Sequence, residues 1–299
     1  MIRITANTTA SRLSADLSRL ASTESRLTQQ MASGKRLTDA SDDVPAAGRV
    51  MGYESEKRSL QQYERNAQRG ITDLAVGTTA LTSIHELASK AFNIGPAASA
   101  SGDPAQQAAM STQIDGLLEQ AVSLSNTQVN GNYLFGSQAT GAAPFTVTRN
   151  GAGQITAVTY GGTGGAAPQI AISEGAQIST TTDGTQNGQL ATYLNNLVQL
   201  RDAVAANNKP VINSTQNAVG DDEDHIVNML STLASSQYRI EVTRTQNTTR
   251  FNQLSDLSSN ETDVNMAETI VKYQSADRSY QAALQAGSKM MKQSLLDYI

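Results

Sequence analysis

The residues of this chain best suited to chemistry form a run of acids that ends in a histidine: Asp221, Asp222, Glu223, Asp224 and His225. Adjacent carboxylates beside an imidazole can bind a hard metal ion or transfer a proton. Acids just before Ile226 would equally complement the positive end of a helix dipole. We favour the second interpretation, because no other acidic cluster or distant histidine is spaced to complete a site.

Two further candidates, His85 and the glycine-rich run 161–165, are weaker. His85 falls within a helical pattern, where a surface or groove position is expected. The glycine-rich run lacks the Gly-Lys-Ser/Thr ending of a phosphate-binding loop and precedes no helix, so it is interpreted as a flexible turn. With two His and no Cys, disulfides, thiolate catalysis and cysteine zinc sites are excluded. We expect no catalytic residue, cofactor or metal, and therefore no enzyme.

Composition limits the class of protein. The chain of 299 residues is 38% hydrophobic and 4% aromatic, which suits slender helices better than a thick globular core. A net charge of -5 offers no basic face to nucleic acid or to an anionic membrane. No apolar run approaches the roughly 18 residues of a membrane span, and residues 1–10 lack the apolar core of a cleaved signal peptide. We expect a cytosolic protein, or one exported without a cleaved signal.

Amphipathic helical patterns occupy both ends of the chain, with apolar residues at alternating steps of four and three. Glu24, Asp277 and Gly287 interrupt them. Terminal segments with so few apolar residues cannot easily bury their apolar stripe against one compact domain. We therefore predict that these segments pack with each other and with neighbouring subunits. This predicted assembly interface consists of Leu13, Leu17, Leu20, Leu27 and Met31 at the front and Ile270, Tyr273, Tyr280, Leu284, Met291 and Leu295 at the back.

The sequence predicts a mainly α fold, in which both terminal regions form a long antiparallel helical bundle and a small central β domain is inserted. The expected domains are a terminal coiled coil (1–44 and 261–299), a helical rod (45–135 and 188–260) and a β insertion (136–187). Helices are expected at about 9–33, 45–93, 104–124, 189–206, 219–254 and 261–298, and strands at 133–135, 146–149, 155–160, 169–173 and 177–180.

Three local sequence patterns support these expected helix and strand limits. Gly95-Pro96 is expected to end the second helix. Asn130-Gly131 favours a tight turn with positive φ. Within the pattern that starts at Val219, the polar residues Gln237, Arg244 and Asn247 are expected to lower stability and to fix the register of the helix.

The segment after the first helix is expected to be a corner between two helices. Gly34 can adopt the left-handed capping conformation, and Pro45 suits the first turn of the next helix. Between them lie a basic pair and acids that can act as caps. The residues of this predicted helix corner are Gly34, Lys35, Arg36, Asp42, Asp43 and Pro45.

The front heptads followed by Ser-Gly-Lys-Arg-Leu (33–37) and Ser-Asp-Asp-Val-Pro-Ala-Ala (41–47) resemble the N-terminal signature of the bacterial flagellin superfamily. The segment 126–136, Asn-Thr-Gln-Val-Asn-Gly-Asn-Tyr-Leu-Phe-Gly, and the ending Ser-Leu-Leu-Asp-Tyr-Ile (294–299) most resemble its hook-associated branch at the hook–filament junction. The resemblance covers about residues 1–145 and 190–299. Family members usually read Ser-Asp-Asp-Pro, so Val44 looks like a one-residue insertion at the corner.

This resemblance implies an extracellular structural subunit of the bacterial flagellum. It would leave the cell through the flagellar type III pathway and form a ring that joins the hook to the filament. The implied partners are other copies of itself, hook-associated protein 1, flagellin and a flagellar export chaperone, with no nucleic acid and no membrane insertion. Because lone helices are marginal in water, the terminal segments are expected to stay mobile until assembly. Flagellin itself and a generic coiled-coil scaffold remain alternatives.

Overall fold

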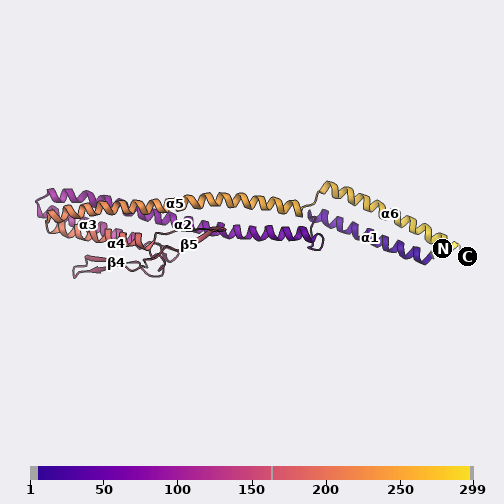
Figure 1. Cartoon of the computed structure of the whole chain (residues 1–299), viewed down its shortest axis with the longest axis horizontal. Coiled ribbons are helices and arrows are strands. Elements are labelled where there is room, and N and C mark those ends of the chain that lie inside the picture. Colours follow the sequence, from indigo (N-terminus) through magenta and orange to yellow (C-terminus); the bar gives the residue numbers. More distant parts are fainter. Residues whose placement is uncertain (1–5, 163, 297–299) are drawn as a thin grey trace. The chain divides into compact units, whose positions relative to one another are not determined.

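The computed structural model describes residues 6–162 and 164–296, with side chains from 11 to 289 apart from residue 163. The fold is mainly α with a small central β region, as predicted (Figure 1). Its helices are α1 (Ala6–Ser33), α2 (Val44–Ala100), α3 (Pro104–Ser125), α4 (Gly184–Ala205), α5 (Lys209–Thr262) and α6 (Met266–Leu296). Its strands are β1 (Gln128–Val129), β2 (Asn132–Tyr133), β3 (Phe145–Arg149), β4 (Ile155–Tyr160), β5 (Gln169–Ser173) and β6 (Ala176–Ser179).

The chain folds into two compact units. Unit 1 contains the residues up to Ser59 and those from Arg250 onward, and unit 2 contains Leu60–Thr249. The long helices α2 and α5 each contribute to both units. The boundaries between the two units, after Ser59 and after Thr249, fall within the segments expected to form the helical rod. The division into three domains that the sequence suggests stays a prediction.

The hydrophobic core of unit 2 joins residues from α2, α3, α4 and α5. Helices α3 and α4 lie side by side, at the end of Figure 1 where their labels stand. Full burial of one such aliphatic side chain contributes about 1.5 to 3 kcal/mol. Among the largest completely buried side chains of these helices are Leu74, Leu81, Ile84, Ile114, Leu118, Leu190, Tyr193, Leu194 and Leu197.

Three separate antiparallel hairpins make up the β region. Asn130 and Gly131 turn the first hairpin with φ of 52° and 81°, the positive pair that a type I′ turn requires. The strand predicted at 133–135 is wrong in its limits, because β2 ends at Tyr133. Leu134 and Phe135 leave the ladder and are buried in the core of unit 2 instead.

Four asparagines attach the β3–β4 and β5–β6 hairpins to the helical part of unit 2. Asn126 bonds both the N–H and the C=O of Phe145 (3.0 and 2.9 Å), and Asn195 does the same for Val158 (2.9 and 2.7 Å). The amides of Asn66 and Asn247 donate to the carbonyl oxygens of Ala171 and Ile172, both at 2.8 Å. Side-chain amides thus satisfy backbone groups at strand edges that a further strand would otherwise pair.

Two helix limits predicted from proline are wrong. Helix α2 continues through Pro96 to Ala100, because one lost hydrogen bond near a helix end is offset by burial of Ile94 and Ala98 on either side. Helix α5 begins at Lys209 rather than near Val219. Pro210 therefore lies in the first turn, where its missing N–H has no intrahelical partner to lose.

The third wrong limit concerns the last helix, which was expected from about Glu261. Helix α5 instead continues to Thr262, and α6 begins at Met266. The break exists because the backbone between them bonds to another segment: Thr262 O accepts from Arg36 N–H (2.7 Å), and Val264 N–H donates to Gly34 O (3.0 Å).

Candidate assembly surface and helix corner

The helix corner begins where the sequence predicted. Gly34 has a φ of 69°, in the left-handed region that only glycine adopts without strain. Its N–H donates to Gln30 O (2.9 Å), which closes the last turn of α1. The amide of Gln30 in turn donates to Arg36 O (2.9 Å) and holds the chain beyond the turn.

Lys35 and Asp263 connect the corner to the break between α5 and α6. The two residues form an isolated antiparallel bridge, and their side chains form an ion pair. Hydrogen bonding from Lys35, and then from the hydroxyls of Ser259 and Thr262, lowers the pKa of Asp263 to about 2. The α1–α2 connection and the α5–α6 connection lie more than two hundred residues apart in sequence. They are thus bonded to each other through both backbone and side chains.

Two arginines of the corner region meet Glu261, close to the end of α5. Arg49 binds its carboxylate through two hydrogen bonds of 2.8 and 2.9 Å, and this pairing lowers the pKa of Glu261. Arg36 donates to the backbone oxygen of Glu261 (2.8 Å) and pairs with Asp43 (3.2 Å). Bidentate arginine–carboxylate contacts are directional, so they orient the start of α2 against the end of α5.

Asp43 is the residue before α2 and caps its first turn. Its carboxylate accepts from the N–H of Ala46 (3.1 Å), and this bond lowers the pKa of Asp43. Val44 and Pro45 are therefore the first two residues of the helix. The apparent insertion leaves the cap intact and places a valine that is 70% exposed at the start of α2.

Asp42 organises the turn before the cap. One of its oxygens accepts from the N–H groups of Thr38 (3.1 Å) and Asp39 (3.0 Å) and from the Thr38 hydroxyl. The two backbone bonds lower the pKa of Asp42. Four of the predicted corner residues, Gly34, Lys35, Arg36 and Asp43, thus belong to one polar network with Glu261 and Asp263, two residues that sequence reasoning did not assign to the corner. Asp42 bonds only within its own turn.

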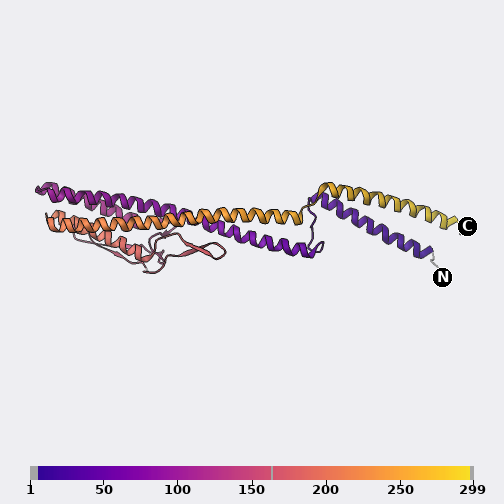
Figure 2. The same ribbon diagram turned by 45° about the horizontal axis from the view of Figure 1, so that its top comes forward.

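Helices α1 and α6 lie side by side in both views (Figures 1 and 2). Among the predicted interface residues, Leu27 is buried, and Leu13, Leu17, Leu20, Met31, Tyr273 and Tyr280 are half-buried. Ile270 and Leu284 are 42% and 45% exposed. The side chains of Met291 and Leu295 lie outside the described residues.

Two of the three interruptions of the stripes, Glu24 and Gly287, face a residue of the opposite helix in this pair. The Tyr273 hydroxyl donates to the carboxylate of Glu24 at 3.4 Å. A Cβ added to Gly287 would lie 2.8 Å from Leu13 Cδ2, which is too close for any larger residue without a shift. Gly287 therefore permits close packing of α6 against α1.

Unit 1 also presents apolar side chains to solvent. They belong to the start of α2, the end of α5 and residues 266–284 of α6. None of them is part of the small buried core of the unit. Exposed apolar surface of this kind marks contact surfaces in other proteins. The residues are Val44, Met51, Leu257, Met266, Ile270, Val271 and Leu284.

The acidic run does not start a helix, so that prediction is wrong: it lies in the interior of α5, twelve residues after Lys209. Asp222 is 5% exposed and accepts from Asn196 (2.6 Å), and burial raises its pKa. His85 of α2 lies 3.5 Å from Glu223, a proximity not foreseen from the sequence. Among the described residues, no group of three or more His, Asp or Glu could hold a metal ion.

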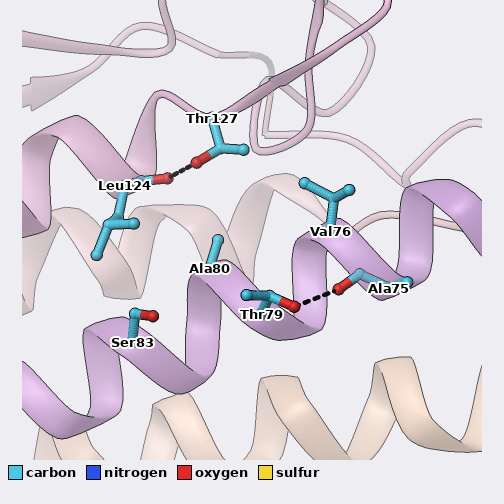
Figure 3. A pocket seen from close by; sticks show the side chains of 7 residues that line it. All are labelled: Ala75, Val76, Thr79, Ala80, Ser83, Leu124 and Thr127. Atoms are coloured by element: carbon cyan, nitrogen blue, oxygen red, sulfur yellow. Dashed lines mark hydrogen bonds between the residues drawn. The ribbon is translucent and has the colours of Figure 1, made fainter.

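An open groove on unit 2 carries no titratable group (Figure 3). The Thr79 hydroxyl donates to Ala75 O (2.9 Å) within α2, and the hydroxyl of Thr127, just beyond the end of α3, donates to Leu124 O (2.6 Å). The groove thus offers no reactive or charged side chain to a ligand. Its lining residues are Ala75, Val76, Thr79, Ala80, Ser83, Leu124 and Thr127.

None of the helices in residues 6–162 and 164–296 is both long and apolar enough to cross a bilayer.

The sequence of this chain is similar to those of known flagellar proteins. Residues 4–140 match the family described as the bacterial flagellin N-terminal helical region. Over 125 residues the chain is 30% identical to flagellar hook-associated protein 3 of Salmonella typhimurium. That stretch covers 40% of this chain and 38% of the relative, so the chain spans less than two thirds of this curated relative.

Solved structures share the fold over most of the chain. A putative flagellar hook-associated protein from Vibrio parahaemolyticus has a TM-score of 0.65 at 18% identity, covering 74% of this chain and 100% of that one. The FlgL protein of Bacillus cereus has a TM-score of 0.60 at 19% identity, covering 70% and 99%. The flagellar junction protein FlgL from Legionella pneumophila has a TM-score of 0.51 at 11% identity, covering 73% and 100%. The predicted resemblance to the flagellin superfamily and to its hook-associated branch is confirmed.

Proposed function

We propose that this chain, a relative of flagellar hook-associated protein 3 with the same fold as the FlgL proteins, is a structural subunit of the bacterial flagellum. It forms the ring that joins the hook to the flagellin filament. The single observation that carries this proposal is the surface of unit 1. Its paired terminal helices leave Ile270, Val271 and Leu284 42% to 65% exposed on α6, where other subunits can bury them.

The physical basis is the incomplete burial of the terminal helix pair. Each apolar Å² removed from water contributes about 25 cal/mol, and α1 and α6 leave much of that gain unrealised in one chain. A ring of identical subunits uses heterologous contacts, in which one face of a subunit meets a different face of the next. The predicted interface residues supply such faces on both helices of the pair, and the terminal segments become rigid when copies meet.

The partners follow from the position in the flagellum that we propose. Copies of the chain bind one another in the ring, hook-associated protein 1 lies on one side and flagellin on the other. An export chaperone binds the chain before secretion. The chain acts as an adapter and not as an enzyme, and its similarity to flagellar hook-associated protein 3 supports this role.

Substitution of Leu284 tests the proposal with little risk to the fold. Leu284→Asp places a charge on a side chain that is 45% exposed in the isolated chain, so the monomer should fold and be secreted. In the ring the same carboxylate would be buried without a partner, at a cost of several kcal/mol, and filaments should detach. The measurements are the secreted level of the protein, motility, and electron microscopy of the hook ends.

Gln113→Asp is the matched control, because Gln113 is an exposed residue of α3 in unit 2 and receives the same charge. It should leave filaments attached. Attached filaments in the Leu284→Asp strain would contradict the proposed interface, and attached filaments in a strain that lacks the protein would contradict the junction role. If sheared filaments consist mainly of this chain, it is a flagellin instead. If the chain is found only inside cells, it is a scaffold.

A further inference from the structure

Three asparagines of the chain precede a glycine: Asn130, Asn150 and Asn187. In such a pair the glycine amide nitrogen can attack the asparagine side-chain carbon, because no side chain shields the glycine. A C–N bond forms, the bond to the amide nitrogen breaks, ammonia leaves and a succinimide ring results. Water then opens the ring to aspartate or isoaspartate. The rate in a folded chain depends on how freely the asparagine amide and the following N–H can move.

Asn130 has both reacting groups open to solvent. Asn130 and Gly131 are exposed at the tip of the β1–β2 hairpin. A Cβ added to Gly131 would meet nothing within 4 Å, so the attacking nitrogen is not crowded. In the described part of the chain, no hydrogen bond holds the Asn130 side chain. Its amide is therefore free to rotate toward the nitrogen of Gly131.

Asn150 is also exposed, but its side chain is held in place. Its Oδ1 accepts from the N–H groups of Ala152 and Gln154, both at 3.0 Å. Its Nδ2 donates to the side-chain oxygen of Gln154 at 3.2 Å. Rotation of this amide toward Gly151 must break these bonds first.

Asn187 is protected by burial and by the helix around it. It is 0% exposed, and its Oδ1 accepts from the Thr182 hydroxyl at 2.5 Å. Its Nδ2 lies 3.4 Å from the Tyr160 hydroxyl. Gly188 lies inside α4, where an α-helix engages the backbone N–H that would have to attack.

We infer that Asn130 is a site of spontaneous covalent modification, converted to aspartate and isoaspartate with water as the only co-reactant. Each conversion adds a negative charge to a chain whose net charge is -5. Isoaspartate also lengthens the backbone by one carbon within the turn. Leu134 lies just beyond β2, three residues after Gly131; its N–H donates to Thr127 O (3.0 Å) and its side chain is buried. The modification therefore reaches the edge of the unit 2 core.

The test compares the three sites within one sample. The full-length chain is kept folded at neutral pH and physiological temperature for weeks and is then digested. The peptide that contains each asparagine is quantified by mass spectrometry, and isoaspartate is measured with an isoaspartate methyltransferase. We expect Asn130 to convert roughly tenfold faster than Asn150, and Asn187 to remain unchanged.

Three controls show whether the fold determines the order of these rates. In denaturant, the three sites should convert at similar rates. Gln154→Ala removes one bond from the Asn150 side chain and should raise the rate at Asn150 toward that at Asn130. Asn130→Gln should abolish conversion at the hairpin tip. Equal rates at Asn130 and Asn150 in the folded chain would overturn the inference, and so would an unchanged order of rates in denaturant.

Discussion

The two units of this protein are stabilised by different forces. Most of the buried apolar residues belong to unit 2, whereas the described part of unit 1 contributes Leu27, Ala46 and Leu254. Unit 1 instead concentrates ion pairs and capping carboxylates near Glu261 and Asp263. Exposed ion pairs contribute only about 0 to 1 kcal/mol each. Unit 2 thus has a complete apolar core within a single chain, whereas unit 1 has defined polar contacts and little buried apolar area.

The largest expected difference between the units comes from a leucine in each. Leu194 of α4 is 0% exposed, so Leu194→Ala should lower the free energy of unfolding by about 2 to 5 kcal/mol. Leu284→Ala in α6 should cost less than about 1 kcal/mol, because that side chain is already half in water. Urea denaturation followed by circular dichroism measures both. Equal losses would mean that unit 1 carries its own core.

A smaller effect is expected at the helix corner. Gly34→Ala forces a residue with a Cβ to keep a φ of 69°, which should cost about 1 kcal/mol. Gly48→Ala is the control within the same unit, because Gly48 lies in α2 with nothing within 4 Å of an added Cβ. It should stabilise the helix by about 0.5 to 1 kcal/mol. Thermal unfolding that moved in the same direction for both variants would refute the role of the left-handed turn.

The smallest effect is a local response to acid, opposite in sign in the two units. A carboxylate whose pKa is lowered on folding adds stability that is present above its ordinary pKa and is lost as the pH falls. In unit 1 this loss runs from near pH 4 to about 2, the pKa of Asp263. In unit 2, burial raises the pKa of Asp222, so protonation there favours the folded state.

Hydrogen exchange can resolve this response. On acidification from about pH 4 to 2, protection should fall first at Arg36 and Val264, whose N–H groups bond across the corner. After correction for intrinsic exchange rates, the amides of α4 near Leu194 should keep theirs. Earlier loss of protection in α4 would reverse the comparison of the two units.

Local signals predicted much of unit 1 and the hairpins. Gly34, Asp43 and Asn130-Gly131 act on their own backbone, so their roles can be read from adjacent residues. The partners of the corner could not, because Glu261 and Asp263 lie more than two hundred residues away in sequence and no periodicity sets the alignment of α1 and α2 against α5. The same lack of long-range information concealed the approach of His85 to Glu223.

The errors in helix limits have a common cause. Pro210 was interpreted as an interruption although proline is also favoured in a first turn, and the acidic run was assigned to the wrong part of α5 as a result. The start of α4 was placed five residues late, at Gln189. The capping box formed by Asp183 and Gln186 was the available signal, since an acid followed three residues later by Gln marks a helix start.

The crossing hydrogen bonds Arg36 N–H to Thr262 O and Val264 N–H to Gly34 O have a mechanical consequence. They join peptide groups, so torque on one terminal helix passes to the other without depending on any side chain. Substitutions on the outward faces of α1 and α6 can therefore change which neighbours the pair fits, while these backbone bonds continue to join the two helices.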